Sequence, residues 1–109
     1  MNIITTRDGF DSKGRKRIQQ QNRDITILQL EGKFYAFDSQ CPHRGGPMFL
    51  CKYIKNKGIM CPSHHIIFKL EGGEILENPI PVSMGDYSHS ENLKTYGIIE
   101  REKDLEIII

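Results

Sequence analysis

Hydrophobic residues lie along this chain in short runs separated by turn residues. The first clear run is DITILQL, Asp24 to Leu30, and a second run, Phe34 to Phe37, follows after Glu31-Gly32-Lys33. Residues that are β-branched or aromatic favour extended strands, and a short glycine-containing spacer between two such runs is typical of a hairpin. The pattern therefore predicts a β-hairpin over residues 24–37.

The same pattern occurs twice more. His65 to Leu70 runs into a glycine-rich spacer before Ile75-Leu76, and Leu93 to Arg101 is followed closely by Leu105 to Ile109. Several short strands with regular turn signals are typical of an all-β sandwich or barrel. We therefore expect an all-β fold built from antiparallel strands.

Other segments carry weaker signals. Phe49 to Lys57 is predicted to hold one short helical turn before Gly58 at most, and VSMGDYSHSEN, Val82 to Asn92, reads as a polar surface loop. The basic run Lys13 to Arg17 is consistent with docking of an acidic partner or with a localisation signal, but a solvated loop is the simpler interpretation.

Length and composition limit the classes of function. The chain has 109 residues, enough for a single domain over residues 1–109, and its 38% hydrophobic and 27% charged content is that of a globular protein. A net charge of +1 argues against general nucleic-acid binding. There is no apolar stretch of about 20 residues and no signal-peptide core at the N-terminus, which predicts a cytoplasmic protein without a membrane anchor.

Two loops combine cysteine with histidine. CPHRGGP spans Cys41 to Pro47, and CPSHH spans Cys61 to His65. Three cysteines cannot all pair with one another, and cytosolic thiols are normally reduced, so metal binding is favoured over a disulfide framework. Cys51 lies between the two loops without a histidine at a similar spacing and is expected to be a packed or partly exposed thiol.

The candidate ligands are Cys41 and His43 in the first loop and Cys61 and His64 in the second. Two cysteines and two histidines would satisfy one tetrahedral zinc ion, but zinc sites usually pair like residues, as Cys-x₂₋₄-Cys and His-x₃₋₅-His. Here each loop offers one ligand of each kind, which fits a binuclear centre. His65 is an alternative to His64, although the Cys-x-x-His spacing favours His64.

Several segments around these ligands resemble the Rieske family of [2Fe–2S] proteins. GKFYAFDSQCPHRGGPM is similar to the family's strand and first ligand loop, and CPSHHIIFKLEGGEI is similar to its second loop and hairpin. Asn78 to Pro81 resembles the proline-rich loop that covers the cluster, and LKTYGI resembles the closing strand. The first 23 residues and Val82 to Asn92 have no clear counterpart.

The resemblance implies a cluster-binding subdomain of two loops, about 41–47 and 61–65, on a Rieske-like β sandwich or barrel. It implies one [2Fe–2S] cluster per chain, with Cys41 and Cys61 on the inner iron and His43 and His64 on the iron nearer the surface. The implied function is a soluble ferredoxin-like electron carrier, not itself an enzyme, between an electron-donating reductase and an accepting oxygenase or reductase. The alternatives are a small subunit or redox-sensing regulator of a larger enzyme and, less favoured, a zinc-stapled binding module.

Five positions depart from particular branches of the family. His65 stands where many members have glycine, which suits a positive φ better than histidine does. Gly46 and Ser63 occupy the positions of an extra disulfide in the quinol-oxidising branch, and Ile66 and Phe68 replace hydroxyl-bearing residues of the high-potential branch. The resemblance thus predicts a low-potential member without the disulfide.

Overall fold

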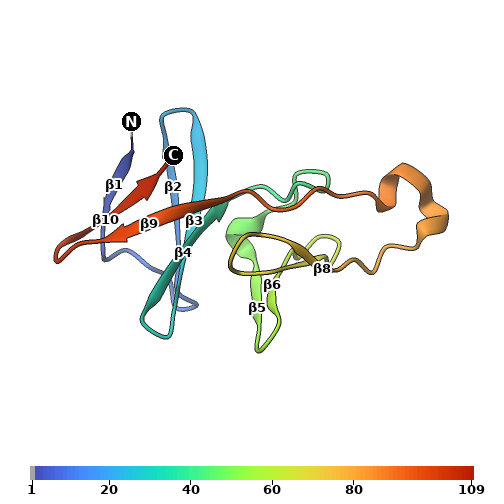
Figure 1. Ribbon diagram of the computed structural model, residues 1–109, viewed down its shortest axis with the longest axis horizontal. Coiled ribbons are helices and arrows are strands. Elements are labelled where there is room, and N and C mark those ends of the chain that lie inside the picture. The colour runs from blue at the N-terminus through green and yellow to red at the C-terminus, as the bar shows by residue number, and fades with distance from the viewer. Residues whose placement is uncertain (1) are drawn as a thin grey trace.

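The structure, a computed structural model, describes residues 2–109, with the backbone alone at position 87. Within these residues the chain forms ten β-strands and two short 3₁₀-helices, η1 (Met48–Leu50) and η2 (Val82–Ser88). The strands make two antiparallel sheets of six and four strands (Figure 1). No helix among the described residues is long and apolar enough to cross a membrane. The expected all-β architecture is confirmed.

The larger sheet draws its strands from both ends of the chain. Its spatial order is β1 (Ile3–Thr6), β10 (Asp104–Ile108), β9 (Thr95–Glu100), β4 (Lys33–Asp38), β3 (Arg23–Leu30) and β2 (Arg15–Gln20). Two tight hairpins fix its register. Gln21 and Asn22 join β2 to β3, and Glu31 and Gly32 join β3 to β4, all four with positive φ between 51° and 79°. Two consecutive positive φ values define the turn whose twist matches that of paired strands.

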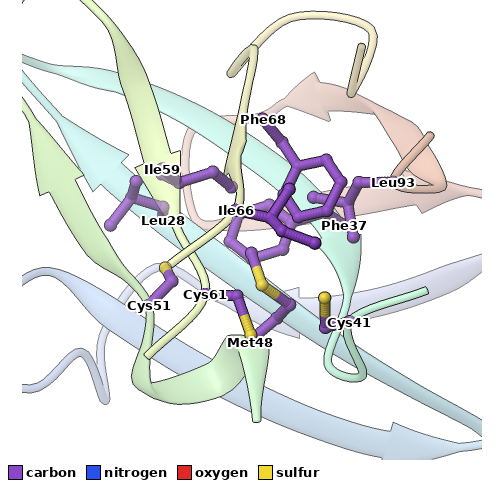
Figure 2. Close-up of a cluster of buried hydrophobic side chains, with 10 residues drawn as sticks. All are labelled: Leu28, Phe37, Cys41, Met48, Cys51, Ile59, Cys61, Ile66, Phe68 and Leu93. Carbon is purple, nitrogen blue, oxygen red and sulfur yellow. The ribbon is translucent and has the colours of Figure 1, made fainter. Parts of the chain in front are cut away.

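Strands β3 and β4 separate two hydrophobic cores. Because side chains alternate between the faces of a strand, Ile27 of β3 and Ala36 of β4 enter one core, whereas Leu28 and Phe37 enter the other. The first core is closed by β1, β2 and β10. The second core lies between the larger sheet and the ligand loops, and Figure 2 shows its side chains. The buried members of this second core are Leu28, Phe37, Cys41, Met48, Cys51, Ile59, Cys61, Ile66, Phe68 and Leu93.

The smaller sheet carries the two ligand loops at one end. It consists of β5 (Lys52–Ile54), β6 (Gly58–Met60), β7 (Ile67–Phe68) and β8 (Ile75–Glu77) in sequence order. The first loop enters it from β4 through η1, and the second joins β6 to β7. Between β8 and β9 the chain runs out beyond the sheets and returns, forming an arm that contains η2 (Figure 1).

All three predicted hairpins are present, as β3–β4, β7–β8 and β9–β10. The interpretation of Lys13 to Arg17 as a loop is wrong for its second half, because β2 begins at Arg15. This strand, RKRIQQ, buries only Ile18 and therefore lacks an alternating pattern. The helical turn expected within residues 49–57 is η1, which ends at Leu50, and strand β5 takes up residues 52–54.

Candidate metal centre

The first ligand loop is closed by two backbone hydrogen bonds. The Cys41 N–H donates to the Gly46 carbonyl at 2.6 Å, and the Gly45 N–H donates to the Cys41 carbonyl at 3.0 Å. Arg44 and Gly45 have φ of 61° and 69°, so the chain turns sharply just after His43. This turn holds Cys41 and His43 on the same short loop.

The second loop repeats this arrangement. The Cys61 N–H donates to the Ile66 carbonyl and the His65 N–H donates to the Cys61 carbonyl, both at 2.9 Å. His65 has φ of 62°, as expected at a position where glycine would be favoured. Since the spacing of the hydrogen-bonded residues is the same in both loops, each cysteine lies at the base of a similar turn.

A buried polar contact anchors the first loop to the larger sheet. The hydroxyls of Ser39 and Thr26 are 2.8 Å apart, and both residues are fully buried. The Ser39 N–H donates to the Asp24 carbonyl at 2.9 Å, and its own carbonyl accepts from the Met48 N–H at 2.8 Å. Ser39 thereby ties β3 to both ends of the loop. Sequence analysis missed this residue, because nothing in the pattern distinguishes a buried serine at the end of a strand from a solvated one.

The structure brings Cys41 and Cys61 together. Both are buried, with exposed fractions of 2% and 0%, and their sulfurs share a hydrogen bond. This bond, together with burial, raises the pKa of Cys41, and the same bond lowers the pKa of Cys61. Backbone N–H groups of Ser63 and His64 also donate to the Cys61 sulfur and lower its pKa. These contacts therefore favour the thiolate at Cys61.

The two histidines also meet. The rings of His43 and His64 pack edge to face with their centroids 4.6 Å apart and an interplanar angle of 82°. His65 is exposed and is not the partner of His43, so the structure favours the expected pair over the alternative. His43 is only 1% exposed, whereas His64 is partly exposed. The edge-to-face contact places the second ring over the first.

Gly46 and Ser63 lie where the two loops touch. A Cβ atom on Gly46 would be 3.3 Å from the Ser63 Cβ and 2.7 Å from the Cys61 sulfur. The first of these distances is close to the separation of two disulfide-linked Cβ atoms, about 3.5–4.5 Å. The positions expected for the additional disulfide are thus adjacent in space, and neither holds a cysteine. All three cysteines are free thiols.

Cys51 is a packed thiol, as the sequence predicted. It is 4% exposed and belongs to the same core as the other two cysteines (Figure 2). Burial raises the pKa of its thiol to about 12, so it remains protonated at neutral pH. Cys51 follows η1 and precedes β5, so it lies outside both ligand loops.

The fold and the paired loops define a small β protein with a two-loop metal centre. The Rieske [2Fe-2S] domain model matches residues 3–97, and the chain belongs to this family. The family's cofactor is a [2Fe–2S] cluster.

Relatives of known identity are distant. The chain is 27% identical over 87 residues to cholesterol 7-desaturase nvd from Hemicentrotus pulcherrimus, covering 79% of this chain and 19% of that protein. It is 27% identical over 64 residues to the ferredoxin component of the alkene monooxygenase system from Xanthobacter autotrophicus, covering 59% of this chain and 52% of the relative. The chain thus spans about a fifth of the desaturase and about half of the ferredoxin component.

Solved structures agree on the fold. The ferredoxin of carbazole 1,9a-dioxygenase from Nocardioides aromaticivorans superimposes with a TM-score of 0.78 over 98% of this chain and 96% of its own, at 13% identity. The terminal oxygenase of carbazole 1,9a-dioxygenase from Novosphingobium gives a TM-score of 0.69 over 92% of this chain but only 27% of its own, at 21% identity. At these identities the likeness establishes the fold.

The donor residues fit a [2Fe–2S] cluster. Such a cluster needs two protein ligands on each of two irons, and in Rieske centres these are two thiolates and two imidazoles. Cys41 pairs with Cys61, and His43 pairs with His64. Within the described part of the chain no three or more His, Cys, Asp or Glu side chains gather about one point. A thiol pair and an imidazole pair supply two ligands of one kind to each iron of such a cluster.

Proposed function

We propose that this chain is a single-domain Rieske-type electron carrier. It takes single electrons from a reductase and delivers them to a partner oxygenase or reductase, and it acts in the cytoplasm. The observation that carries the proposal is the meeting of the Cys-x-His and Cys-x-x-His loops, with thiol against thiol and imidazole against imidazole. Cys41 and Cys61 would hold one iron, and His43 and His64 the other.

The residues around the two thiols would stabilise the negative charge that a bound cluster gains on reduction. When bound, a [2Fe–2S] cluster stores and releases one electron. The N–H groups of Ser63 and His64 point at the Cys61 sulfur and stabilise negative charge there. The surrounding core, with Phe37, Met48 and Phe68 all fully buried, excludes water from the cysteine side. His64, the partly exposed ligand, would be the route by which electrons enter and leave.

The relatives support a carrier whose partner does the substrate chemistry. Over nearly its whole length the chain has the fold of a dioxygenase ferredoxin, and part of it matches a monooxygenase ferredoxin component. The desaturases and oxygenases that it matches are several times longer. A carrier requires only the part of those enzymes that this chain resembles.

The decisive experiment is metal and sulfide analysis of the purified protein with its visible spectrum. We expect two irons and two acid-labile sulfides per chain, and absorption that bleaches on reduction by one electron equivalent. A colourless protein with one zinc per chain would contradict the proposal. A coloured protein that binds its partner differently when reduced, but passes it no electrons, would instead favour the redox-sensing alternative.

A further inference from the structure

The arm between β8 and β9, residues 78–92, extends past both ligand loops (Figure 1). Polar contacts within the arm hold its shape. Asn78 Nδ2 donates to the Ser88 carbonyl at 2.7 Å, across the base of the excursion, and Asn78 Oδ1 accepts from the Ile80 N–H at 3.1 Å. The Ser88 hydroxyl donates to the Gly85 carbonyl at 2.7 Å. The arm is thus held by hydrogen bonds within the loop, and its described side chains form no hydrophobic core of their own.

Two large apolar side chains of the arm and one beside it face solvent. Val82 is 88% exposed and Met84 52% exposed, and Leu76 at the start of the excursion is 46% exposed. Single exposed apolar residues are common, but Val82 and Met84 lie two residues apart on the projecting arm, and the fold buries neither. A partner could bury them.

The arm is joined to the metal centre at both ends. Ile80 packs against the core that contains Cys41 and Cys61, and Leu93, just after the arm, is a buried member of that core. The Leu93 N–H also donates to the Gly73 carbonyl at 2.8 Å, next to β8. A protein docked on the arm would therefore lie beside the ligand loops, where an electron can be passed.

The charge on this part of the chain has one sign. Residues 71–92 contain five carboxylates and no lysine or arginine: Glu71, Glu74, Glu77, Asp86 and Glu91. All five are exposed, and among the described residues only Glu77 forms an ion pair, with Lys57. By contrast, residues 39–70 contain five basic residues and no carboxylate. The segment that carries the exposed Val82 and Met84 is thus acidic.

We propose that the arm is the docking element for an electron-transfer partner whose surface has an apolar patch ringed by lysine and arginine. Apolar contact from Val82 and Met84 would supply most of the holding strength, and the carboxylates would steer the encounter. This inference rests on the electron-carrier function proposed above and adds the chemistry of the partner surface.

The test uses the cluster-loaded protein, reduced by one electron equivalent beforehand and freed of excess reductant, and cytochrome c, a small basic haem protein, as the probe. The cluster loses one electron and the ferric haem iron gains it, so the second-order rate of haem reduction reports productive docking. The apolar variant is V82S/M84S, the charge variant is D86N/E91Q, and the matched control is I4S/I99S, which removes two exposed apolar side chains from the far sheet. Ferricyanide serves as an acceptor that needs no docking surface.

We expect the rate to fall about tenfold in V82S/M84S and to stay unchanged in I4S/I99S. In D86N/E91Q we expect a rate about threefold lower at low salt and a weaker salt dependence. Acetylated cytochrome c, whose lysines are neutral, should abolish the difference between D86N/E91Q and the wild type. Ferricyanide should oxidise all four proteins equally.

A wild type that reduces cytochrome c no faster than the arm variants overturns the docking proposal. So does an equal loss in I4S/I99S. Failure of the carrier function has a different signature, because a wild type that reduces neither cytochrome c nor ferricyanide overturns both proposals together.

Discussion

Gly72 and Gly73 offer a comparison in which neighbouring residues differ only in their surroundings. Both have positive φ, 87° and 76°. A Cβ on Gly72 would meet nothing closer than the Glu74 carboxylate at 3.7 Å, whereas a Cβ on Gly73 would lie 2.0 Å from the Leu93 carbonyl oxygen. Gly72→Ala should therefore cost only the left-handed backbone strain, about 1 kcal/mol.

Gly73→Ala should cost about 3 kcal/mol or more, because the backbone of Leu93 must also move by roughly 1 Å to reach an ordinary C···O contact. The hydrogen bond from the Leu93 N–H to the Gly73 carbonyl would be distorted by the same movement. For a domain of this size the loss corresponds to a melting temperature lower by about 12 °C or more.

The assay is thermal unfolding followed by circular dichroism, with iron content measured on the same samples. Leu93 packs in the core that holds Cys41 and Cys61, so Gly73→Ala should also lower the iron content, while Gly72→Ala should not. Equal melting temperatures for the two variants, or a lower value for Gly72→Ala, would refute the close contact as the cause.

Three further predictions concern the centre and its support. Cys41→Ser and Cys61→Ser should each abolish the cluster and destabilise the domain, whereas Cys51→Ser should keep its iron; loss of iron from Cys51→Ser alone would overturn the ligand assignment. The wild-type potential should lie toward the lower end of the range of about −150 to +300 mV, and voltammetry of Ile66→Ser and Phe68→Tyr should show a rise of roughly 40 mV for each hydroxyl that reaches a sulfur. A wild-type value near the top of the range, or no rise in either variant, would count against this. Hydrogen bonds from Arg17, and further ones from Ser39 and Gln19, lower the pKa of the Asp24 carboxyl. The ionised Asp24 therefore stabilises the folded state above its unfolded pKa near 3.8, and this stabilisation is lost as the pH falls through the lower folded pKa. Acid unfolding should accordingly be less steep in Asp24→Asn, and identical acid profiles would contradict the linkage.

The parts of the fold that the sequence predicts are those where the local pattern and the tertiary environment agree. The β3–β4 hairpin has runs of β-branched and aromatic residues on both sides of a turn with positive φ, and it forms as expected. The ligand loops can also be recognised in the sequence, because cysteine and histidine are common metal ligands and here stand close together in each loop. The structure adds the backbone hydrogen bonds that close each loop and the contacts that pair the two loops.

The parts that the sequence does not predict depend on partners far along the chain. Strand β2 is mostly polar because it lies at an edge of the sheet, and only pairing with β3 makes it a strand. Strand β1 pairs with β10, about a hundred residues away in the sequence, and no local signal specifies that contact. The contact of the buried His43 ring with His64 of the second loop is likewise a contact between residues distant in sequence.

The environment of the three cysteines explains why identical side chains should behave differently. All are buried in one core, so burial alone would keep each thiol protonated. Cys41 and Cys61 differ from Cys51 in that each stands at the base of a tight loop, with backbone N–H groups of the following residues directed at its sulfur. Cys51 follows η1 and enters β5, where its pKa is set mainly by burial. Position in a ligand loop therefore distinguishes the two thiols that share a hydrogen bond from Cys51.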